Sequence, residues 1–409
     1  MTDRSAPNRM KMLDDRTVRL DGPRLAPETV RGARAVRTVD LAAVAENWRA
    51  LSARVAPARC AAVIKAGAYG IGRRDAKVLA EGLAAIGCDA FFVAAIDEAI
   101  ALGPVANHAD IFVLDGLIPD RANEYMAGIQ PVLSTRAQIE AWAHHCKALG
   151  ARKPAAVHID TGMSRLGLTP EEIPSIAERT DLFEAFALSL VVSHPACADD
   201  LANPMTAEQL ARFNALRAKL PTAPASFANS AAIFHGPEYH LDLVRPGISL
   251  YGARAVNDVP NPMQPAVGLH GRILQVRTIP FGASVGYGAR FVAQRDTRVA
   301  TIATGYADGY ERALGNAPKA DRPRVWIAGQ PAPIVGRVSM DLITADVTDI
   351  PDGDVSEGDW AELFGVNQSV DDLADICGTI GYELLTGIGT RAARVGWTVE
   401  GDQLYSLEG

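Results

Sequence analysis

The stretch Ala62-Val63-Ile64-Lys65-Ala66-Gly67-Ala68-Tyr69-Gly70 places a lysine at the end of an apolar run and directly before a glycine-containing turn. The run Ala61–Ile64 is typical of a buried strand, and helical periodicity follows over Arg74–Ile86. A lysine in apolar surroundings has a lowered pKa and becomes a better nucleophile toward an aldehyde. Lys65 is therefore a candidate for a Schiff base with pyridoxal phosphate. The alternative is a lysine that reaches past the strand end into solvent, and position alone does not separate the two.

The alternation of strand and helix continues from about residue 35 to residue 252. A cap at Asp97 and a capping box at Thr206 and Gln209 predict helix starts, the second for a helix over Ala207–Leu220. This alternation favours a parallel α/β architecture, and the number of repeats favours a (β/α)₈ barrel of the TIM type over an open sheet. Active sites of such barrels lie at the carboxyl ends of the strands. Further strands are predicted at Phe91–Ala95, Ile111–Leu114, Pro131–Leu133, Ala155–Ile159, Leu188–Val192 and Ala225–Phe227.

After about Pro262 the sequence becomes rich in glycine and β-branched residues, with turn signals such as Pro351-Asp352-Gly353. We predict one helix there, around Val370–Cys377, in an otherwise mostly β domain. The expected organisation is a flexible arm over residues 1–33, a barrel domain over 34–262 and a C-terminal β domain over 263–409. The predicted β strands are Gly271–Ile279, Arg298–Ala303, Arg324–Ala328, Pro333–Val338 and Thr344–Val347.

Composition narrows the class of protein. The 409 residues are 48% hydrophobic and 22% charged, which is typical of globular proteins. A net charge of −8 argues against nucleic acid or an anionic membrane as a partner. The five scattered cysteines show no metal-binding spacing, so we expect no metal and reduced thiols. No apolar run approaches the roughly 20 residues of a membrane span, and no secretory signal is found. We therefore expect a cytoplasmic protein.

The lysine motif over Ala62–Gly72 resembles that of alanine racemases, which are pyridoxal-phosphate-dependent isomerases. Seven further motifs match that family in its own order and extend the resemblance over about residues 35–395. They are His158–Gly167, Ser193-His194, Ala228–Ala231, Arg245–Gly252, Gly286–Gly288, Gly305–Tyr310 and Gly336–Asp341.

The resemblance implies a head-to-tail homodimer in which each active site combines one subunit's barrel with the partner's β domain. It implies that L-alanine and D-alanine are interconverted by a two-base mechanism through an external aldimine, supplying D-alanine for peptidoglycan. Lys65 would hold the cofactor and serve one face of the amino acid. Tyr287, from the partner subunit, would serve the other, because racemisation removes a proton on one side and returns one on the opposite side.

Other roles follow from the same resemblance. Arg245 would face the pyridine nitrogen and donate a hydrogen bond without protonating it, because guanidinium keeps its proton. The ring would then be a weaker electron sink, which suits a racemase. His194 would lie near the ring, hydrogen-bonded to Arg245, and Arg165 would supply positive charge. The remaining expected contacts are Tyr69, Asn229, Ser230, Gly247, Ile248 and Thr390 near the cofactor phosphate, with Met340 and Tyr306 beside Arg165 in the substrate pocket.

Three positions depart from the family pattern. Gly67 stands where many members have asparagine, and we expect it to loosen the turn. His158 replaces a lysine that can be carbamylated, so a chloride ion or direct contact with neighbouring side chains must orient Arg165 instead. Thr390 stands where a tyrosine commonly contacts the phosphate, and its hydroxyl has a shorter reach.

Three other functions stay open. A racemase of broader specificity, acting on serine as well as alanine, would differ mainly in pocket size. A decarboxylase of the same two-domain architecture relies on a partner-subunit cysteine, and Cys377 is the only cysteine of the predicted β domain. A protein that only binds pyridoxal phosphate would keep the barrel and its lysine but would lack the β domain with its Gly286-Tyr287-Gly288 motif.

Overall fold

The computed structural model describes residues 10–12, 18–20, 30, 32–105, 109–125, 128–318, 322–397 and 404–406. They fall into two compact units. The barrel unit comprises Ala45–Leu250 and Arg254–Met263, and the β unit comprises Met1–Val44, Tyr251–Ala253 and Gln264–Gly409. Most of the predicted arm over residues 1–33 lies outside the described residues. Within it, β1 (Met10–Met12) pairs with β2 (Val18–Leu20).

Seven parallel strands form the centre of the barrel unit, in the order β11-β10-β9-β8-β7-β6-β5. The short strand β12 (Leu243–Val244) pairs in parallel with β4 (Arg59–Cys60). Arg245 directly follows β12, and its N–H donates at 2.8 Å to the carbonyl of Ala228, which lies just after β11. Backbone bonds therefore join the two edges of the curled sheet, and the predicted barrel-type fold is confirmed. The seven strands are β5 (Ala62–Val63), β6 (Ala90–Val93), β7 (Asp110–Val113), β8 (Ile129–Leu133), β9 (Pro154–His158), β10 (Ala187–Val192) and β11 (Ala225–Ser226).

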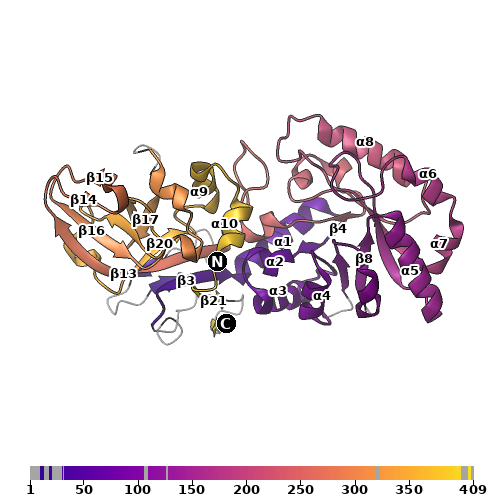
Figure 1. The fold of residues 1–409 in the computed structure, drawn as a ribbon, viewed down its shortest axis with the longest axis horizontal. Helices are drawn as coiled ribbons and strands as arrows, with labels where there is room; N and C mark the ends of the chain where they lie inside the picture. Colours follow the sequence, from indigo (N-terminus) through magenta and orange to yellow (C-terminus); the bar gives the residue numbers. More distant parts are fainter. Residues whose placement is uncertain are drawn as a thin grey trace, which may run out of the picture. The chain divides into compact units, whose positions relative to one another are not determined.

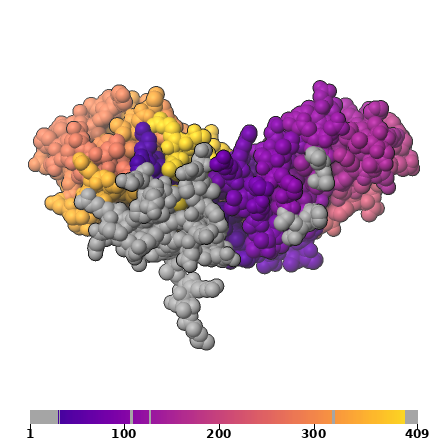
Figure 2. Space-filling view, turned by 90° about the horizontal axis from the view of Figure 1, so that it is seen from below, coloured from indigo at the N-terminus to yellow at the C-terminus, as the bar shows by residue number. Residues whose placement is uncertain are grey.

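Helices cover the outside of these strands, and Figure 1 shows α5, α7, α6 and α8 in this order along the outer side of this unit. Helix α5 illustrates why they form: Ile139, Trp142, Ala143 and Cys146 are buried at helical spacing, Thr135 Oγ1 caps its start, and Gly150 ends it with φ 63°. The space-filling view shows one face of the barrel unit, coloured from purple to pink (Figure 2). The helices are α1 (Leu41–Val55), α3 (Arg73–Ala85), α4 (Ile96–Leu102), α5 (Arg136–Leu149), α6 (Glu172–Ala177), α7 (Thr180–Ala185) and α8 (Met205–Arg217).

Both predicted capping patterns are wrong in detail. Helix α8 begins at Met205 after Pro204, and Thr206 Oγ1 is buried without a hydrogen-bond partner among the described residues. The Gln209 side chain instead bonds Ala196 N at 2.8 Å and His194 O at 3.1 Å. Helix α4 starts after Ala95, and Asp97 pairs with Arg121 at 2.8 Å. Spacing alone could not distinguish a cap from these longer-range contacts.

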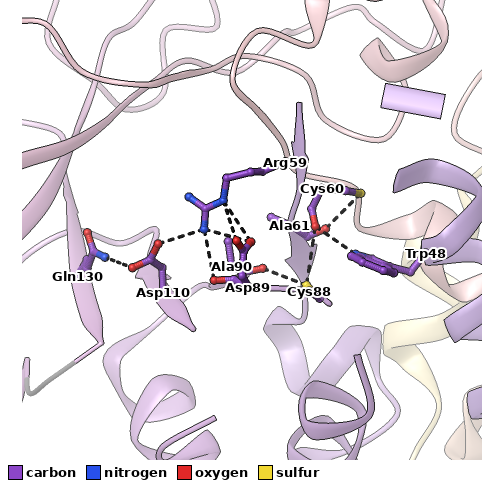
Figure 3. A network of polar contacts seen from close by, with 9 residues as sticks. All are labelled: Trp48, Arg59, Cys60, Ala61, Cys88, Asp89, Ala90, Asp110 and Gln130. Carbon is purple, nitrogen blue, oxygen red and sulfur yellow. Dashed lines mark hydrogen bonds and ion pairs between the residues drawn. The ribbon is translucent and has the colours of Figure 1, made fainter. Parts of the chain in front are cut away.

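A polar network joins the amino ends of neighbouring barrel strands (Figure 3). Arg59 Nε donates to both carboxylate oxygens of Asp89 at 3.1 Å, and its Nη2 contacts Asp110 at 3.2 Å. Gln130 extends the row by donating to Asp110 at 2.7 Å. These side chains are partly exposed, so each ion pair adds about 1 kcal/mol or less to stability. The network therefore links the amino ends of the strands, at the face opposite to the one that carries the active site in such barrels.

The cysteines form no disulfide, and three of them are buried. All five are free, and burial raises the pKa of the Cys60 and Cys88 thiols far from the reactive range. Among the described residues, no group of histidine, cysteine and carboxylate side chains could hold a metal ion. No helix in this part of the chain is long and apolar enough to cross a membrane.

The β unit is organised around one long strand, β13 (Val267–Ile279). Its first half pairs with β3 (Ala35–Asp40) and β20 (Trp360–Phe364), and its second half pairs with β16 (Thr297–Ile302) after a register shift. Because β3 pairs with this strand, it belongs to the β unit, whereas the predicted domain division placed it with the barrel. The remaining strands are β14 (Ser284–Val285), β15 (Phe291–Val292), β17 (Arg324–Ile327), β18 (Gln330–Pro333), β19 (Ile343–Asp346), β21 (Ala393–Trp397) and β22 (Leu404–Ser406).

Two predictions for this unit need correction. The strand expected at Pro333–Val338 ends at Pro333 in β18, because Gly329 makes a tight turn with φ 75° and the hairpin lies earlier. A second helix, α10 (Gly381–Gly387), follows the predicted α9 (Val370–Cys377). This helix was not predicted, because the glycines at its two ends have low helix propensity. Burial of Leu384 and Leu385 stabilises it.

Candidate active site

Lys65 begins an unusual turn at the carboxyl end of β5. Ala66, Gly67 and Ala68 have φ of 54°, 58° and 55°, and Tyr69 continues the run with φ 54°. An L-residue in this left-handed conformation costs roughly 1–2 kcal/mol, whereas glycine avoids that cost. Gly67 therefore suits the turn rather than loosening it. Runs of strained backbone persist only where their surroundings hold them, and they cluster at functional sites.

The surroundings of Lys65 favour a neutral amine. Burial lowers the pKa of its ammonium group, and the positive charges of Arg165 and Arg245 lower it further. The carboxylates of Glu98 and Asp115 act in the opposite direction. Neither acid was predicted from the sequence, although both follow barrel strands at their carboxyl ends, which is a signal that could have found them. A lysine with a lowered pKa is a better nucleophile toward an aldehyde.

Arg245 is the buried cation of the barrel unit's site, only 6% exposed. Its guanidinium donates to Ser226 Oγ, to the carbonyl of Ser193 at 2.6 Å and to that of Phe227 at 3.3 Å. Burial lowers its pKa to about 10, so it stays charged at neutral pH. Among the described residues the guanidinium makes these three hydrogen bonds and none to His194, so the predicted hydrogen bond between Arg245 and His194 is not found.

His194 follows β10 and faces the same cations. Burial lowers its pKa well below the usual value, and Arg245, Arg165 and Lys65 add to the effect. Its carbonyl accepts a bond from Gln209, whose amide also donates to Thr161 Oγ1 at 3.2 Å. Helix α8 therefore holds together the loops after β9 and β10. This role of Gln209 was not predictable from the sequence, because Thr161 lies 48 residues earlier in the chain.

Tyr69, Ser230 and Gly247 form a small cradle. Ser230 Oγ accepts the N–H of Gly247 at 2.8 Å, and a Cβ at position 247 would overlap the Tyr69 hydroxyl. Ile248 is fully buried and begins a short 3-10 turn over Ile248–Tyr251. Hydroxyl groups and backbone N–H groups at the start of a turn are the donors that bind phosphate in proteins. With Lys65, whose pKa is lowered, and the buried Arg245 of the same unit, these residues fit pyridoxal phosphate.

Two further predicted phosphate contacts, Asn229 and Thr390, stay predictions. Asn229 Oδ1 accepts the N–H of Ala232 at 2.9 Å, so its side chain caps the turn that presents Ser230. Thr390 is exposed and lies in the β unit, just after α10. The structure therefore gives Asn229 a supporting place beside the cradle.

Gly247→Ala is expected to weaken retention of pyridoxal phosphate by about tenfold or more, because overpacking a filled site costs about 1–3 kcal/mol. The added methyl group must displace the Tyr69 hydroxyl from the cradle. Gly82→Ala in α3 is the matched control, since nothing lies within 4 Å of its added Cβ. Equilibrium dialysis of the cofactor measures the effect. Equal retention by both variants would show that Tyr69 and Gly247 do not form a phosphate site.

Arg165 stands exposed in the loop after β9. Asp160 shapes this loop by accepting the N–H groups of Gly162, Met163 and Ser164 at 2.9, 3.0 and 3.1 Å. In the described part of the chain, Arg165 forms no hydrogen bond or ion pair. The direct side-chain contact considered as a replacement for the family's lysine is therefore not found, although the charge of Arg165 still acts on Lys65.

His158, which replaces that lysine, is a neutral group in the fold. Burial and the charge of Arg245 lower its pKa to about 4, and its Nδ1 lies 3.4 Å from Ser134 Oγ. It cannot supply the negative charge of a carbamate.

The lowered pKa of His158 predicts that the folded protein loses stability in acid. Below about pH 6.5 the unfolded chain protonates His158, whereas the native protein resists until about pH 4. The free energy of unfolding should therefore fall on acidification through this window, by at most about 3 kcal/mol from this group. Urea denaturation at several pH values tests it, with His158→Asn expected to lose less stability between pH 6.5 and 4. Parallel pH profiles for the two proteins would contradict the assignment.

The β unit carries the other predicted site residues on exposed loops. Tyr287, 73% exposed, lies between β14 and β15, where Gly286 and Gly288 both have φ 72°. Tyr306 and Met340 are 41% and 53% exposed. Their two loops are bound together, because Tyr306 N and Ala307 N donate to Ser339 O and Met340 O at 3.0 Å. Arg391 strengthens the pair of loops by binding Asp308 at 3.1 Å and Asp341 at 2.8 Å.

A barrel with a lysine of lowered pKa, a buried arginine and an anion cradle, followed by a mostly β unit, is typical of two-domain pyridoxal-phosphate enzymes. The model of the alanine racemase N-terminal domain matches residues 39–255, and that of the alanine racemase C-terminal domain matches residues 266–396. The chain belongs to the alanine racemase family. The predicted family and enzyme class, an isomerase, are thereby confirmed.

Individual relatives agree with this assignment. The chain is 46% identical to an alanine racemase of Rhodospirillum rubrum, over 88% of this chain and 96% of the relative. It is 44% identical to a catabolic alanine racemase of Mesorhizobium japonicum, over 90% and 94% respectively. Among solved structures, alanine racemase from Bartonella henselae, with covalently bound pyridoxal phosphate, has a TM-score of 0.82 and 38% identity, covering 89% of this chain and 100% of that one.

Proposed function

We propose that this protein interconverts L-alanine and D-alanine with pyridoxal phosphate held on Lys65. The observation that carries the proposal is the juxtaposition in one unit of a lysine with a lowered pKa and the cradle of Tyr69, Ser230 and Gly247. The family's name supports alanine as the substrate, and the relative from Bartonella henselae supports the cofactor.

The roles of the site residues follow from the stereochemistry of the reaction. Bound pyridoxal phosphate withdraws electrons from the amino acid joined to it and so acidifies the α-proton. Lys65 Nζ takes or returns that proton on one face, and Tyr287 Oη does so on the other. Arg245, which stays charged, would donate to the pyridine nitrogen without protonating it. Arg165 supplies positive charge near the reacting amine.

We also propose that two subunits share each site. Tyr287, Tyr306 and Met340 are exposed in a single chain, although a catalytic phenol needs a shielded pocket to act on a bound substrate. The same unit exposes further large apolar side chains, which mark an interaction surface. They are Leu274, Phe281, Val292 and Leu342.

The cellular role has two candidates. The family resemblance favours D-alanine supply for peptidoglycan in the cytoplasm, whereas two relatives are named catabolic alanine racemases. Deletion of the coding sequence separates the candidates. A requirement for added D-alanine supports the biosynthetic role, and loss of growth on alanine as carbon source supports the catabolic role. Fractionation of the cells tests the location.

The activity is tested by giving the purified protein L-alanine and D-alanine separately while optical rotation and carbon dioxide are followed. Loss of rotation from both, without gas, is expected. Gas release would indicate the decarboxylase, and bound cofactor without either change would indicate a binding protein. L-Serine in the same assay measures the breadth of specificity.

A further inference from the structure

Glu98 contacts two loops at the carboxyl ends of neighbouring barrel strands. It lies in the first turn of α4, and its Oε2 accepts the N–H of Ala94 at 2.8 Å and that of Ala95 at 3.4 Å. Its Oε1 accepts the N–H of Gly67 at 3.3 Å. One carboxylate therefore joins the loop after β6 to the turn that carries Lys65.

The turn bonded by Glu98 is the left-handed segment described above. Its internal hydrogen bonds run from Gly70 N to Ala66 O at 2.9 Å and from Gly72 N to Gly67 O at 2.7 Å. These bonds hold the shape of the turn but do not connect it to a neighbouring strand. The bond from Glu98 makes that connection two residues after Lys65, so it restrains the direction in which the lysine leaves β5.

We propose that Glu98 is a positioning residue that holds the Lys65 turn against the loop after β6, so that the Lys65 amine meets the aldehyde of pyridoxal phosphate. This proposal rests on the proposed function of Lys65. The contact requires a carboxylate, because each of its two oxygens accepts from a different loop. A glutamine amide has only one acceptor oxygen and loses one of the two connections in either orientation.

Glu98 also acts on Lys65 through its charge, and this effect can be separated from positioning. The charged groups acting on the lysine are Arg165 and Arg245, which lower its pKa, and Glu98 and Asp115, which raise it. Removing the charge of Glu98 should lower that pKa further and leave more neutral amine at a given pH. Charge alone therefore predicts faster attachment of the cofactor, whereas lost positioning predicts slower attachment.

The test uses the full-length protein freed of cofactor, in the wild type, Glu98→Gln, Glu98→Asp and the control Asp97→Asn. Asp97 is the neighbouring acid in the same helical turn, but it pairs with Arg121. Attachment of pyridoxal phosphate at pH 7 is followed by absorbance, and borohydride trapping with peptide mapping identifies Lys65. The pH midpoint of Lys65 labelling by an amine-reactive reagent is measured separately.

We expect Glu98→Gln to slow attachment by about tenfold or more while the labelling midpoint moves to lower pH. Glu98→Asp, which keeps the charge but loses a methylene of reach, should also slow attachment with its midpoint near the wild-type value. Asp97→Asn should change neither quantity. A general loss of packing would lower the melting temperature without producing this pattern.

Wild-type attachment rates in both Glu98 variants would overturn the proposal, and so would faster attachment in Glu98→Gln with a lowered midpoint. If the glutamine variant does not fold, hydrogen exchange of residues 65–72 in Glu98→Asp supplies the test, with faster exchange expected and unchanged exchange contradicting it. A wild-type protein that attaches the cofactor to Lys65 without racemising alanine would defeat the proposed function and leave this inference intact.

Discussion

Replacing Lys65 with alanine is expected to lower the rate of racemisation by about four orders of magnitude or more and to remove covalent attachment of the cofactor. The variant loses the nucleophile and one of the two proposed bases together. The fold should survive, because the side chain is only half-buried and its removal ends the cost of desolvating a charge. Absorbance of the bound cofactor and the rate of optical-rotation loss are the measurements.

Two variants control for charge and for lysine loss in general. Lys65→Arg keeps a cation in place but cannot form the covalent bond, so it should be as inactive as Lys65→Ala. Lys77→Ala removes a lysine from α3, where its ammonium bonds Leu102 O and Glu81 at 3.0 Å on the outside of the barrel. It should keep full activity. Covalent cofactor on another lysine in Lys65→Ala would contradict the assignment.

Lys65→Ala also tests whether two subunits share each active site. Inactive Lys65→Ala and inactive Tyr287→Phe are mixed under conditions that exchange subunits. A hybrid dimer then has one site with both residues intact and one with neither, so part of the activity should return. Exchange is verified by mass spectrometry of differently tagged subunits. Verified exchange without recovery would mean that Lys65 and Tyr287 act within one chain.

Strand ends were the most predictable part of the molecule. Apolar runs bounded by helical periodicity located β5 to β11 to within a few residues, and Lys65 was found because it follows one such run. The left-handed turn after it was not predictable, since three of its four residues at positions 66–69 are alanine or tyrosine, which avoid that conformation. Tertiary contacts, among them the one from Glu98, hold it there.

Side-chain partners were less predictable than backbone elements. The spacing of Thr206 and Gln209 matched a capping box, but the glutamine reaches Thr161 and His194, which lie far earlier in the chain. The expected pair of Arg245 and His194 failed for a similar reason. The guanidinium bonds Ser226 and two carbonyls, and His194 feels it through its charge.

Tyr287→Phe is expected to keep the cofactor and to slow conversion of L-alanine to D-alanine by about 10²–10⁴-fold, the range for losing one general acid or base. Phenylalanine preserves the exposed ring between Gly286 and Gly288, so only the hydroxyl group is lost. Lys65 remains able to exchange the α-proton on its own face. Exchange of deuterium into D-alanine should therefore decline much less than racemisation.

The ratio of these two rates separates catalysis from folding, because a misfolded protein loses both together. Tyr306→Phe, in another exposed loop of the β unit, is the matched control and should leave the ratio unchanged. Both rates are obtained from one incubation in deuterated water, by NMR for exchange and by a chiral assay for inversion. Equal declines in Tyr287→Phe would mean that the phenol serves binding rather than proton transfer. Full activity in both directions would mean that a different group serves the second face of the substrate.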